Sequence, residues 1–345
     1  MMSERSTLLT SIANTSRDYR VGEIERPSLD HVDRWVQQFD KNVQIQLLRE
    51  LDFVLKKTYL NRETVATFLA SMIASRKLAG DDPCAFWAKA HFLNIQTSGN
   101  SQEEMLEIVD EILQEECGLD VKTCGERGGD YIYVDDVMFS GNRVGNDLAA
   151  WIVDKAPAKA TVHIVVAAIH TSGEYLVGNR LKKAIVDSGK AIQLNYWRIA
   201  TVENRKFYRN DSEVLWPADV PSDAATQHYL GLPHKFPLEL RKPGGHLGPF
   251  SSEQGRRLLE SELLVAGVRI RGLSQSPKDI LRPLGFSPFG VGFGSMTVTY
   301  RNCPNNCPLA LWWGDPDATS GPFHWYPLFP RKTYTGAVDL DAIIF

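Results

Sequence analysis

Apolar residues first recur at helical spacing in the N-terminal part of the chain. After Ser28, a candidate helix N-cap, the pattern i, i+3, i+4, i+7 is filled by Val32, Trp35, Val36 and Phe39. Similar stripes follow over residues 43–55 and, after Asn61, over residues 65–72. The pattern predicts a helical N-terminal subdomain over residues 28–80, preceded by a flexible leader over residues 1–27.

From about residue 88 the pattern changes to short apolar runs that alternate with helical segments. Apolar runs typical of buried strands cover residues 90–96, 128–136, 161–170 and 191–200. Helical periodicity covers residues 101–116, 144–156 and 175–189, and Ser101 with Glu104 has the pattern of a capping box. Strands that alternate with helices of this length predict βαβ units, and therefore an α/β core with a parallel sheet over residues 88–202.

Residues 203–345 are weakly periodic and rich in proline and aromatic residues, and they are expected to form an accessory or hood region. A helix is predicted over residues 251–267 with Ser252 as its N-cap, a strand over residues 295–300, and a buried apolar run over residues 309–313. The aromatic residues of this region either stack on a nucleobase or form a second hydrophobic core, and we prefer the core; they are Phe286, Phe289, Phe293, Trp312, Trp313, Trp325 and Tyr326.

Composition narrows the class of protein only a little. The chain has 345 residues and a formal net charge of −4, so no general nucleic-acid-binding surface is implied. It has no apolar run long enough to span a membrane and no hydrophobic segment typical of a secretory signal. Because five cysteines make an odd count, we expect reduced thiols and a cytoplasmic protein. Cys303 and Cys307 lack a second ligand pair, which favours buried thiols over a zinc site.

Three predicted strands run into Ser-Gly turns. The turns are TSGNS at 97–101, FSGNR at 139–143 and TSGE at 171–174. Because parallel strands end at one edge of a sheet, we expect these turns to lie together where α/β sheets bind ligands. The helix that follows each turn offers backbone N–H groups to an anion, although Ser and Gly also suit an ordinary βα turn. His170 precedes the third turn and is expected at the surface or in the turn.

Asp135 and Asp136 are the most informative residues of the chain. They are expected to end a buried strand, where two unpaired carboxylates are costly, just before the turn at 139–143. Carboxylates at this edge can accept hydrogen bonds from a sugar diol or hold Mg²⁺. A diol site beside an anion-binding loop predicts a ribose 5-phosphate ligand.

The stretch YIYVDDVMFSGNR resembles the signature of type I phosphoribosyltransferases, in which an apolar strand, two acids and a Thr/Ser-Gly loop follow one another. The resemblance implies that Asp135 and Asp136 are catalytic residues that hold the ribose diol and Mg²⁺. It implies that Phe139, Ser140, Gly141, Asn142 and Arg143 form the 5-phosphate loop, where Phe139 and Arg143 depart from the usual small hydroxyl residues. Ser98, Gly99 and Asn100 take the place of the pyrophosphate or second-anion loop, but without its usual Arg or Lys.

The overall layout, a helical segment before the sheet and an aromatic-rich segment after it, resembles the phosphoribosyltransferase-like (PRTase-CE-like) proteins of bacterial conflict systems, including retrons. This resemblance implies an anti-phage effector that transfers or cleaves at ribose C1, with phosphoribosyl pyrophosphate or a nucleotide as ligand. It also implies partners, such as a reverse transcriptase with its non-coding RNA–DNA, or a second copy of the chain.

Three alternatives stay open at this stage. The chain could sense nucleotides without transfer chemistry, and the lack of a basic pyrophosphate loop favours this reading. It could be a glycosidic-bond hydrolase that uses the same carboxylates to stabilise a ring cation. It could also be an interaction subunit that binds a protein–nucleic-acid complex through its helical N-terminus.

Overall fold

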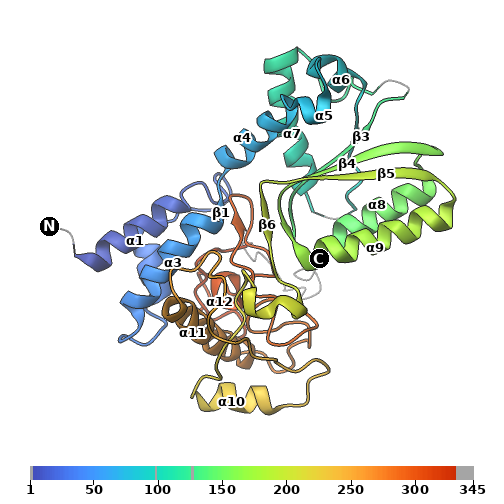
Figure 1. Cartoon of the computed structure of the whole chain (residues 1–345). Helices are drawn as coiled ribbons and strands as arrows, with labels where there is room; N and C mark the ends of the chain where they lie inside the picture. The colour runs from blue at the N-terminus through green and yellow to red at the C-terminus, as the bar shows by residue number, and fades with distance from the viewer. Residues whose placement is uncertain (1–2, 98, 126–127, 332–345) are drawn as a thin grey trace. The chain divides into compact units, whose positions relative to one another are not determined.

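A computed structural model describes residues 3–97, 99–125 and 128–331 of the chain (Figure 1). The described residues form two compact units. The sheet unit comprises Arg62–Glu203, and the discontinuous unit combines residues up to Asn61 with those from Asn204 onward.

The sheet unit is built on five parallel strands, as the alternating pattern predicts. The order is β2-β3-β4-β5, and β6 also pairs with β4 beyond the end of β5. The strands are β2 His91–Leu93, β3 Tyr131–Met138, β4 Lys159–His170, β5 Ala191–Trp197 and β6 Ala200–Val202. The sheet therefore has the class of fold that the sequence predicts, an α/β core with a parallel sheet.

Helices cover both faces of this sheet (Figure 1). They are α4 Arg62–Ile73, α5 Arg76–Ala79, α6 Pro83–Lys89, α7 Ser101–Cys117, α8 Asn142–Asp154 and α9 Thr171–Ser188. Helices α8 and α9 lie on one face and α4 and α7 on the other. Tyr133, Leu148, Val166 and Leu181 belong to the core between the sheet and the α8–α9 layer. This layer fixes the position of α8, and thereby of the loop that precedes it.

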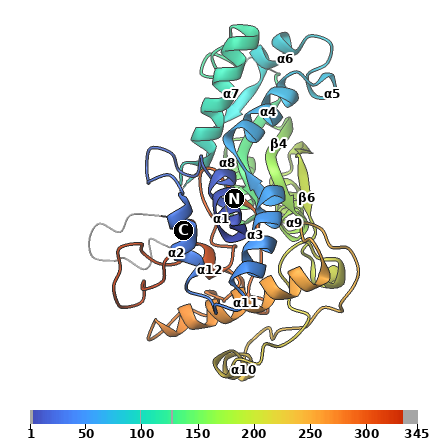
Figure 2. The same ribbon diagram turned by 90° about the vertical axis from the view of Figure 1, so that its left-hand side faces the viewer.

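The discontinuous unit is mainly helical and has one large aromatic core. Its elements are α1 Glu4–Thr15, α2 Leu29–Val36, α3 Gln44–Thr58, β1 Tyr59–Leu60, the 3-10 helix η1 Lys206–Asp211, α10 Ala224–Gly231, α11 Glu253–Gly272, β7 Val298–Thr299 and α12 Leu309–Trp312. Strands β1 and β7 pair in parallel. The long helix α11 is seen lengthwise in Figure 2, with α3 and α12 beside it. Ser252 caps α11 through its side chain, as predicted.

The N-terminal residues differ from the flexible leader expected for residues 1–27. Ser3 caps α1, and Leu9, Ile12 and Ala13 are buried. These three residues follow the spacing i, i+3, i+4, and α1 packs against α3. The predicted helical subdomain over residues 28–80 is also divided, because α4 and α5 belong to the sheet unit.

Most aromatic residues of the hood region are core residues. Phe286, Trp312, Trp313 and Trp325 are buried in the large core of the discontinuous unit. Phe289 is 53% exposed and packs against Phe236. For these four buried side chains, the preferred prediction of a second hydrophobic core is confirmed.

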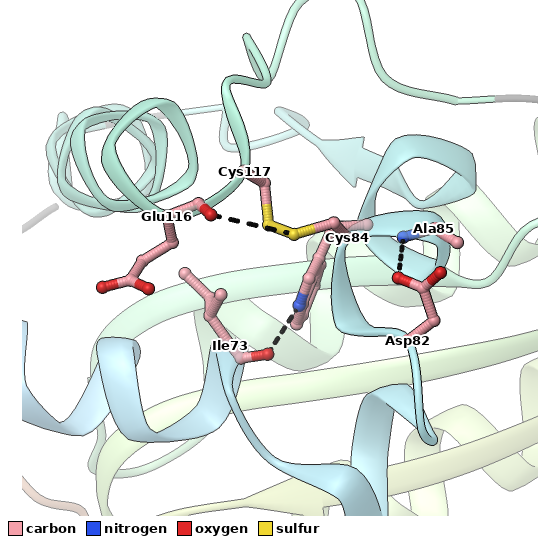
Figure 3. The surroundings of a disulfide bond; sticks show 7 residues. Ile73, Asp82, Cys84, Ala85, Glu116 and Cys117 are labelled. Atoms are coloured by element: carbon pink, nitrogen blue, oxygen red, sulfur yellow. Dashed lines mark hydrogen bonds between the residues drawn. A yellow bond between two sulfur atoms is a disulfide. The ribbon is translucent and has the colours of Figure 1, made fainter.

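A disulfide bond joins Cys84 of α6 to Cys117 at the end of α7 (Figure 3). The expectation that all cysteines are reduced is therefore wrong for this pair. The two residues lie 33 positions apart, a spacing that carries no local signal, and only the packing of α6 near the end of α7 brings their Cα atoms to 5.4 Å. Cys303 and Cys307 are buried free thiols, as predicted.

Among the described residues, no helix combines the length and the apolar character that a membrane crossing requires.

Candidate functional site

The two aspartates lie inside β3 rather than at its end. Beyond them, Val137 and Met138 still pair with Ala168 and Ile169 of β4, so the prediction that the strand ends at the acids is wrong. Because side chains alternate along a strand, Asp135 and Asp136 point to opposite faces of the sheet. The two carboxylates consequently have different surroundings.

Asp135 is a buried carboxylate, with 5% of its surface exposed. Burial and the neighbouring Asp136 raise its pKa to about 7, while the Ser101 hydroxyl, the Asp136 N–H and the charge of Arg143 partly oppose this shift. Its Oδ1 accepts the Asp136 N–H at 2.9 Å, and Tyr133 Oη lies 3.4 Å from Oδ2. The buried phenol of Tyr133 has a raised pKa, through burial first and then through Asp135 and Asp147. Asp135 thus lies in a dry, polar cluster on the α8 side of β3.

Asp136 is half-buried and therefore the more accessible of the two acids. Its Oδ1 accepts the N–H of Val137 at 2.7 Å. Asp135, whose pKa is raised to about 7, has the surroundings of a group close to losing or gaining a proton at neutral pH.

The predicted phosphate loop turns sharply from β3 into α8. Gly141 occupies the N-cap position with φ of +71°, a left-handed conformation that glycine adopts without strain. A Cβ at Gly141 would lie 2.4 Å from Val177 Cγ2, and one at Gly173 would lie 2.0 Å from the carbonyl oxygen of Phe139. The two glycines therefore let this loop pack against the first turn of α9. Asn142 begins α8 and is exposed, and its N–H lies 3.5 Å from Ser140 Oγ at the carboxyl edge of the sheet.

Phe139 packs against His170, a residue that the sequence analysis expected at the surface or in a turn. The Phe139 ring lies 4.8 Å from the fully buried ring of His170, whose Nδ1 is 3.3 Å from the carbonyl oxygen of Met138. Burial lowers the pKa of His170 to about 3, so the ring is neutral at ordinary pH. The expectation of a surface or turn histidine is wrong, because β4 extends through His170 and α9 begins directly at Thr171. The third Ser-Gly segment is therefore the first turn of a helix rather than a separate loop.

The predicted second-anion loop lies between β2 and α7. Ser98 lies outside the described residues, whereas Gly99 and Asn100 are exposed, and Asn100 is the N-cap of α7 without a side-chain cap. The predicted capping box is not formed, because Ser101 is already the first helical residue. Its hydroxyl instead accepts a hydrogen bond from Gln96 Nε2 and forms one with Asp135.

Arg143 and Asp147, one helical turn apart on α8, both reach this second loop. A Cβ built on Gly99 would lie 3.3 Å from Arg143 Nη1, and the same nitrogen is 3.5 Å from Ser101 Oγ. Asp147 Oδ1 accepts the hydroxyl of Thr97 at 3.2 Å, and the Thr97 backbone N–H also donates to this carboxylate. Burial raises the pKa of Asp147, while these hydrogen bonds and Arg143 lower it. The structure therefore brings the two predicted loops together through α8.

The sequence analysis did not identify Asp147. The side chain is buried, and its Oδ2 has no hydrogen-bond partner within the described residues. One signal was available: Asp147 lies between Val144 and Leu148 on the buried stripe of α8, where a charged residue needs an explanation.

The site combines two carboxylates with two loops that precede helices, all at the carboxyl edge of the parallel sheet. In the part of the chain that the structure describes, no three His, Cys, Asp or Glu side chains are grouped as a metal cage. A divalent cation at this edge would therefore take its remaining ligands from water or from a bound phosphate.

Comparison with curated proteins and with solved structures finds no match. The model of one family, described as PRTase-CE, matches residues 32–331. This match covers most of the chain, including both loops and the two aspartates. The chain therefore belongs to the PRTase-CE family, a phosphoribosyltransferase-like family.

Proposed function

We propose that this protein binds the ribose 5-phosphate part of phosphoribosyl pyrophosphate or of a nucleotide, and that it transfers or cleaves at ribose C1. One observation carries the proposal. Asp135 and Asp136 lie on a central strand of the sheet that leads, through a glycine-capped turn, into the exposed N-terminus of α8. A diol-binding acid pair thus lies five to six residues before an anion-binding helix end.

The division of roles follows from the surroundings of each residue. Ser140, Gly141 and Asn142 offer backbone N–H groups and a hydroxyl to the 5-phosphate. Asp136, the more accessible acid, accepts hydrogen bonds from the ribose hydroxyls. Asp135 lies deeper, and its carboxylate supplies negative charge to the ring as positive charge develops at C1.

A magnesium ion fits this donor set, and we propose it as the cofactor. Carboxylate oxygens are hard ligands, and Mg²⁺ is commonly held by one or two carboxylates together with substrate phosphates and water. Asp136 is suited to hold the ion directly, with Asp135 behind it. When bound, the ion would neutralise phosphate charge on the ligand.

In the proposed reaction, the bond between ribose C1 and the leaving group breaks, and both electrons go to the leaving group. A nucleophile then donates a lone pair to C1 and forms the new bond. The chain contributes placement and charge more than proton transfer. His170 is too deeply buried to serve as a base, because its ring is closed in by Phe139 and Met138.

We further propose a role as an effector in a bacterial conflict system, on the resemblance described above. In that setting a reverse transcriptase with its nucleic acid, or a second copy of the chain, would hold the activity in check. A cytoplasmic location accords with this role.

The test is binding of phosphoribosyl pyrophosphate with Mg²⁺, measured by calorimetry for wild type and for Asp135→Asn/Asp136→Asn. We expect wild type to bind and the double variant to lose about 100-fold or more in affinity, because both carboxylates of the proposed site are removed. Thermal unfolding of the double variant should match or exceed that of wild type, since a buried charge is removed. Equal affinity of the two proteins would contradict the proposal.

A nucleotide sensor is the second candidate, because the second loop contains no Arg or Lys of its own. Binding of AMP with no binding of phosphoribosyl pyrophosphate would favour the sensor. Consumption of phosphoribosyl pyrophosphate in the presence of a nucleobase would favour the transferase.

A further inference from the structure

Arg143 belongs to the loop at residues 139–143, but its guanidinium lies against the second loop, at residues 97–101. It lies against Gly99, with Cζ 3.6 Å and Nη1 3.3 Å from the position of a Cβ there, and it approaches Ser101. Arg143 is the second residue of α8, and its Cα therefore lies beside the predicted phosphate loop. Its charged end lies next to the first residue of α7. The residue is exposed, and a ligand can therefore reach its side chain.

The second loop is held in place from α8. Asp147, one turn after Arg143, accepts two hydrogen bonds from Thr97 at the beginning of the loop. Arg143 contacts the end of the loop at Gly99 and Ser101. Two side chains of one rigid helix thus fix the loop at both ends, which sets the distance between the loop and the N-terminus of α8.

The hydrogen-bonding capacity of Arg143 is largely unused. A guanidinium carries five N–H donors, and the hydrogen bond described for this one is the 3.5 Å contact with Ser101. Asp135 and Asp147 both lie within reach of its charge, yet neither forms an ion pair with it within the described residues. Planar donors of this kind suit phosphate oxygens.

A second side chain beside the loop, Gln102, also has an unused donor within the described residues. Gln102 is fully buried, and its Oε1 accepts the N–H groups of Ile95 and Gln96. Its Nε2 is a buried donor without an acceptor in the described residues. The backbone N–H of Gln102 already donates to Gln96 Oε1 at 3.0 Å, so an anion bound at the start of α7 would bring an acceptor to the side-chain Nε2 rather than to this N–H.

We infer that Arg143 supplies the positive charge which the second loop lacks, and that it selects ligands with a diphosphate on ribose C1. This inference rests on the proposed function and makes it more specific. The 5-phosphate is held by the backbone of residues 140–142, and the C1 diphosphate by Arg143 with the N–H groups at the start of α7. Arg143 is thus a specificity-determining residue that serves the leaving group and not the 5-phosphate.

The experiment compares three ligands in the presence of Mg²⁺: phosphoribosyl pyrophosphate, inorganic pyrophosphate and ribose 5-phosphate. Affinities are measured by calorimetry for wild type, Arg143→Ala and Arg143→Lys, each checked for an unchanged thermal unfolding midpoint. We expect Arg143→Ala to weaken both diphosphate ligands by about 10- to 100-fold and ribose 5-phosphate by less than about threefold. Arg143→Lys should restore part of the diphosphate affinity, because it keeps the charge but loses the planar donor pair.

Arg180→Ala is the matched control. Arg180 belongs to α9 and donates to the carbonyl oxygen of Asn142 at 3.2 Å and to Asn146 Oδ1, so it is a positive charge near the same helix end that contacts α8 and has no hydrogen bond to the described residues of the second loop. Its removal should change no ligand by more than about threefold.

Other results would overturn the inference in distinguishable ways. An equal loss of all three ligands in Arg143→Ala would assign Arg143 to the 5-phosphate. An unchanged affinity for the diphosphates would make Arg143 a structural residue. Wild type that binds ribose 5-phosphate but neither diphosphate would leave the ribose phosphate site intact and remove the diphosphate assignment. Wild type that binds none of the three would remove the proposed function and this inference together.

Discussion

The two units differ in how their most conspicuous buried charges are paired. In the discontinuous unit, the buried side chains of Arg241 and Arg256 form ion pairs with buried Glu260. In the sheet unit, Asp135 and Asp147 are buried without an ion pair to any described residue. We interpret the paired charges as structural, and the proposed function assigns the unpaired ones to a ligand.

The network of the discontinuous unit centres on Glu260 of α11. Its carboxylate accepts from Arg241 Nε and Nη2 at 3.0 and 2.8 Å and from Arg256 Nε at 2.8 Å. Arg256 also donates to Ser212 Oγ at 2.8 Å and lies over the Phe250 ring. All three charged residues are at most 2% exposed. Their donors and acceptors are used within the unit, so the network has no capacity left for a ligand.

The cluster of the sheet unit is arranged differently. Asp135 and Asp147 are each 5% exposed, and burial raises the pKa of both carboxyl groups. Oδ2 of Asp147 has no hydrogen-bond partner within the described residues. Such an arrangement costs free energy in the isolated chain, and under the proposed function a ligand that supplies hydroxyls or a cation would recover this cost. Buried carboxylates without an ion pair, next to the two loops, are therefore the feature on which the proposed function depends.

The largest predicted loss of stability comes from a substitution that breaks the buried network around Glu260. Glu260→Gln leaves the buried guanidinium of Arg256 without its counter-charge and leaves Arg241 with Glu253 alone, and it should cost about 3–5 kcal/mol of folding free energy. Denaturant unfolding followed by hydrogen exchange in α11 measures this loss, and binding of phosphoribosyl pyrophosphate below the unfolding transition should be unchanged. The control is Asp219→Asn, which removes an exposed partner of Arg257 and should cost less than about 1 kcal/mol. Equal costs for the two variants would contradict the contrast.

The next largest effect is expected from removing the disulfide bond of the sheet unit, compared with removing a free thiol of the discontinuous unit. The Cys84–Cys117 bond encloses the second loop and α7, and the chain-entropy estimate for a loop of this size is about 3–4 kcal/mol. Cys84→Ser/Cys117→Ser should therefore increase hydrogen exchange in β3 and β4 while leaving α11 protected. Cys303→Ala is the comparison in the other unit, since it removes a buried thiol that closes no loop. A double serine variant as stable as wild type would show that the bond adds nothing to the fold.

The smallest effect concerns acid stability. The folded pKa of His170 is about 3, below the ordinary value of 6.5, so the unfolded chain binds a proton first as the pH falls. His170 therefore contributes its full stabilisation above about pH 6.5, and the sheet unit loses about 1.4 kcal/mol per pH unit below that, until the folded ring also protonates near pH 3. At pH 4.5 this amounts to about 2–3 kcal/mol.

His170→Gln tests this slope by hydrogen exchange in β4 between pH 7 and pH 4.5, with exposed His228→Gln as the control. The slope should flatten in the first variant only. An unchanged slope in His170→Gln would assign the acid sensitivity of the sheet unit to its carboxyl groups.

Much of the sheet unit could be predicted from periodicity. Apolar runs alternating with helical segments indicate βαβ units, and every main strand predicted over residues 88–202 is present. The acid pair and the Ser-Gly turn were identified because their chemistry is local to a few residues. The roles of Arg143 and Asp147 could not be read in the same way, because each contacts a residue more than 40 positions earlier in the chain.

The sequence by itself determined the class of fold, the acid pair and the two loops, since these depend on short-range patterns of polarity and on residue types. Only the tertiary structure decided that Asp135 is buried beside Tyr133, that Arg143 lies against the neighbouring loop, that His170 is enclosed, and that Cys84 meets Cys117. The physical reason is the same in each case. Burial and pairing depend on which distant segments pack together, and the free energy that fixes that packing is spread over the whole core and is not encoded in any single motif.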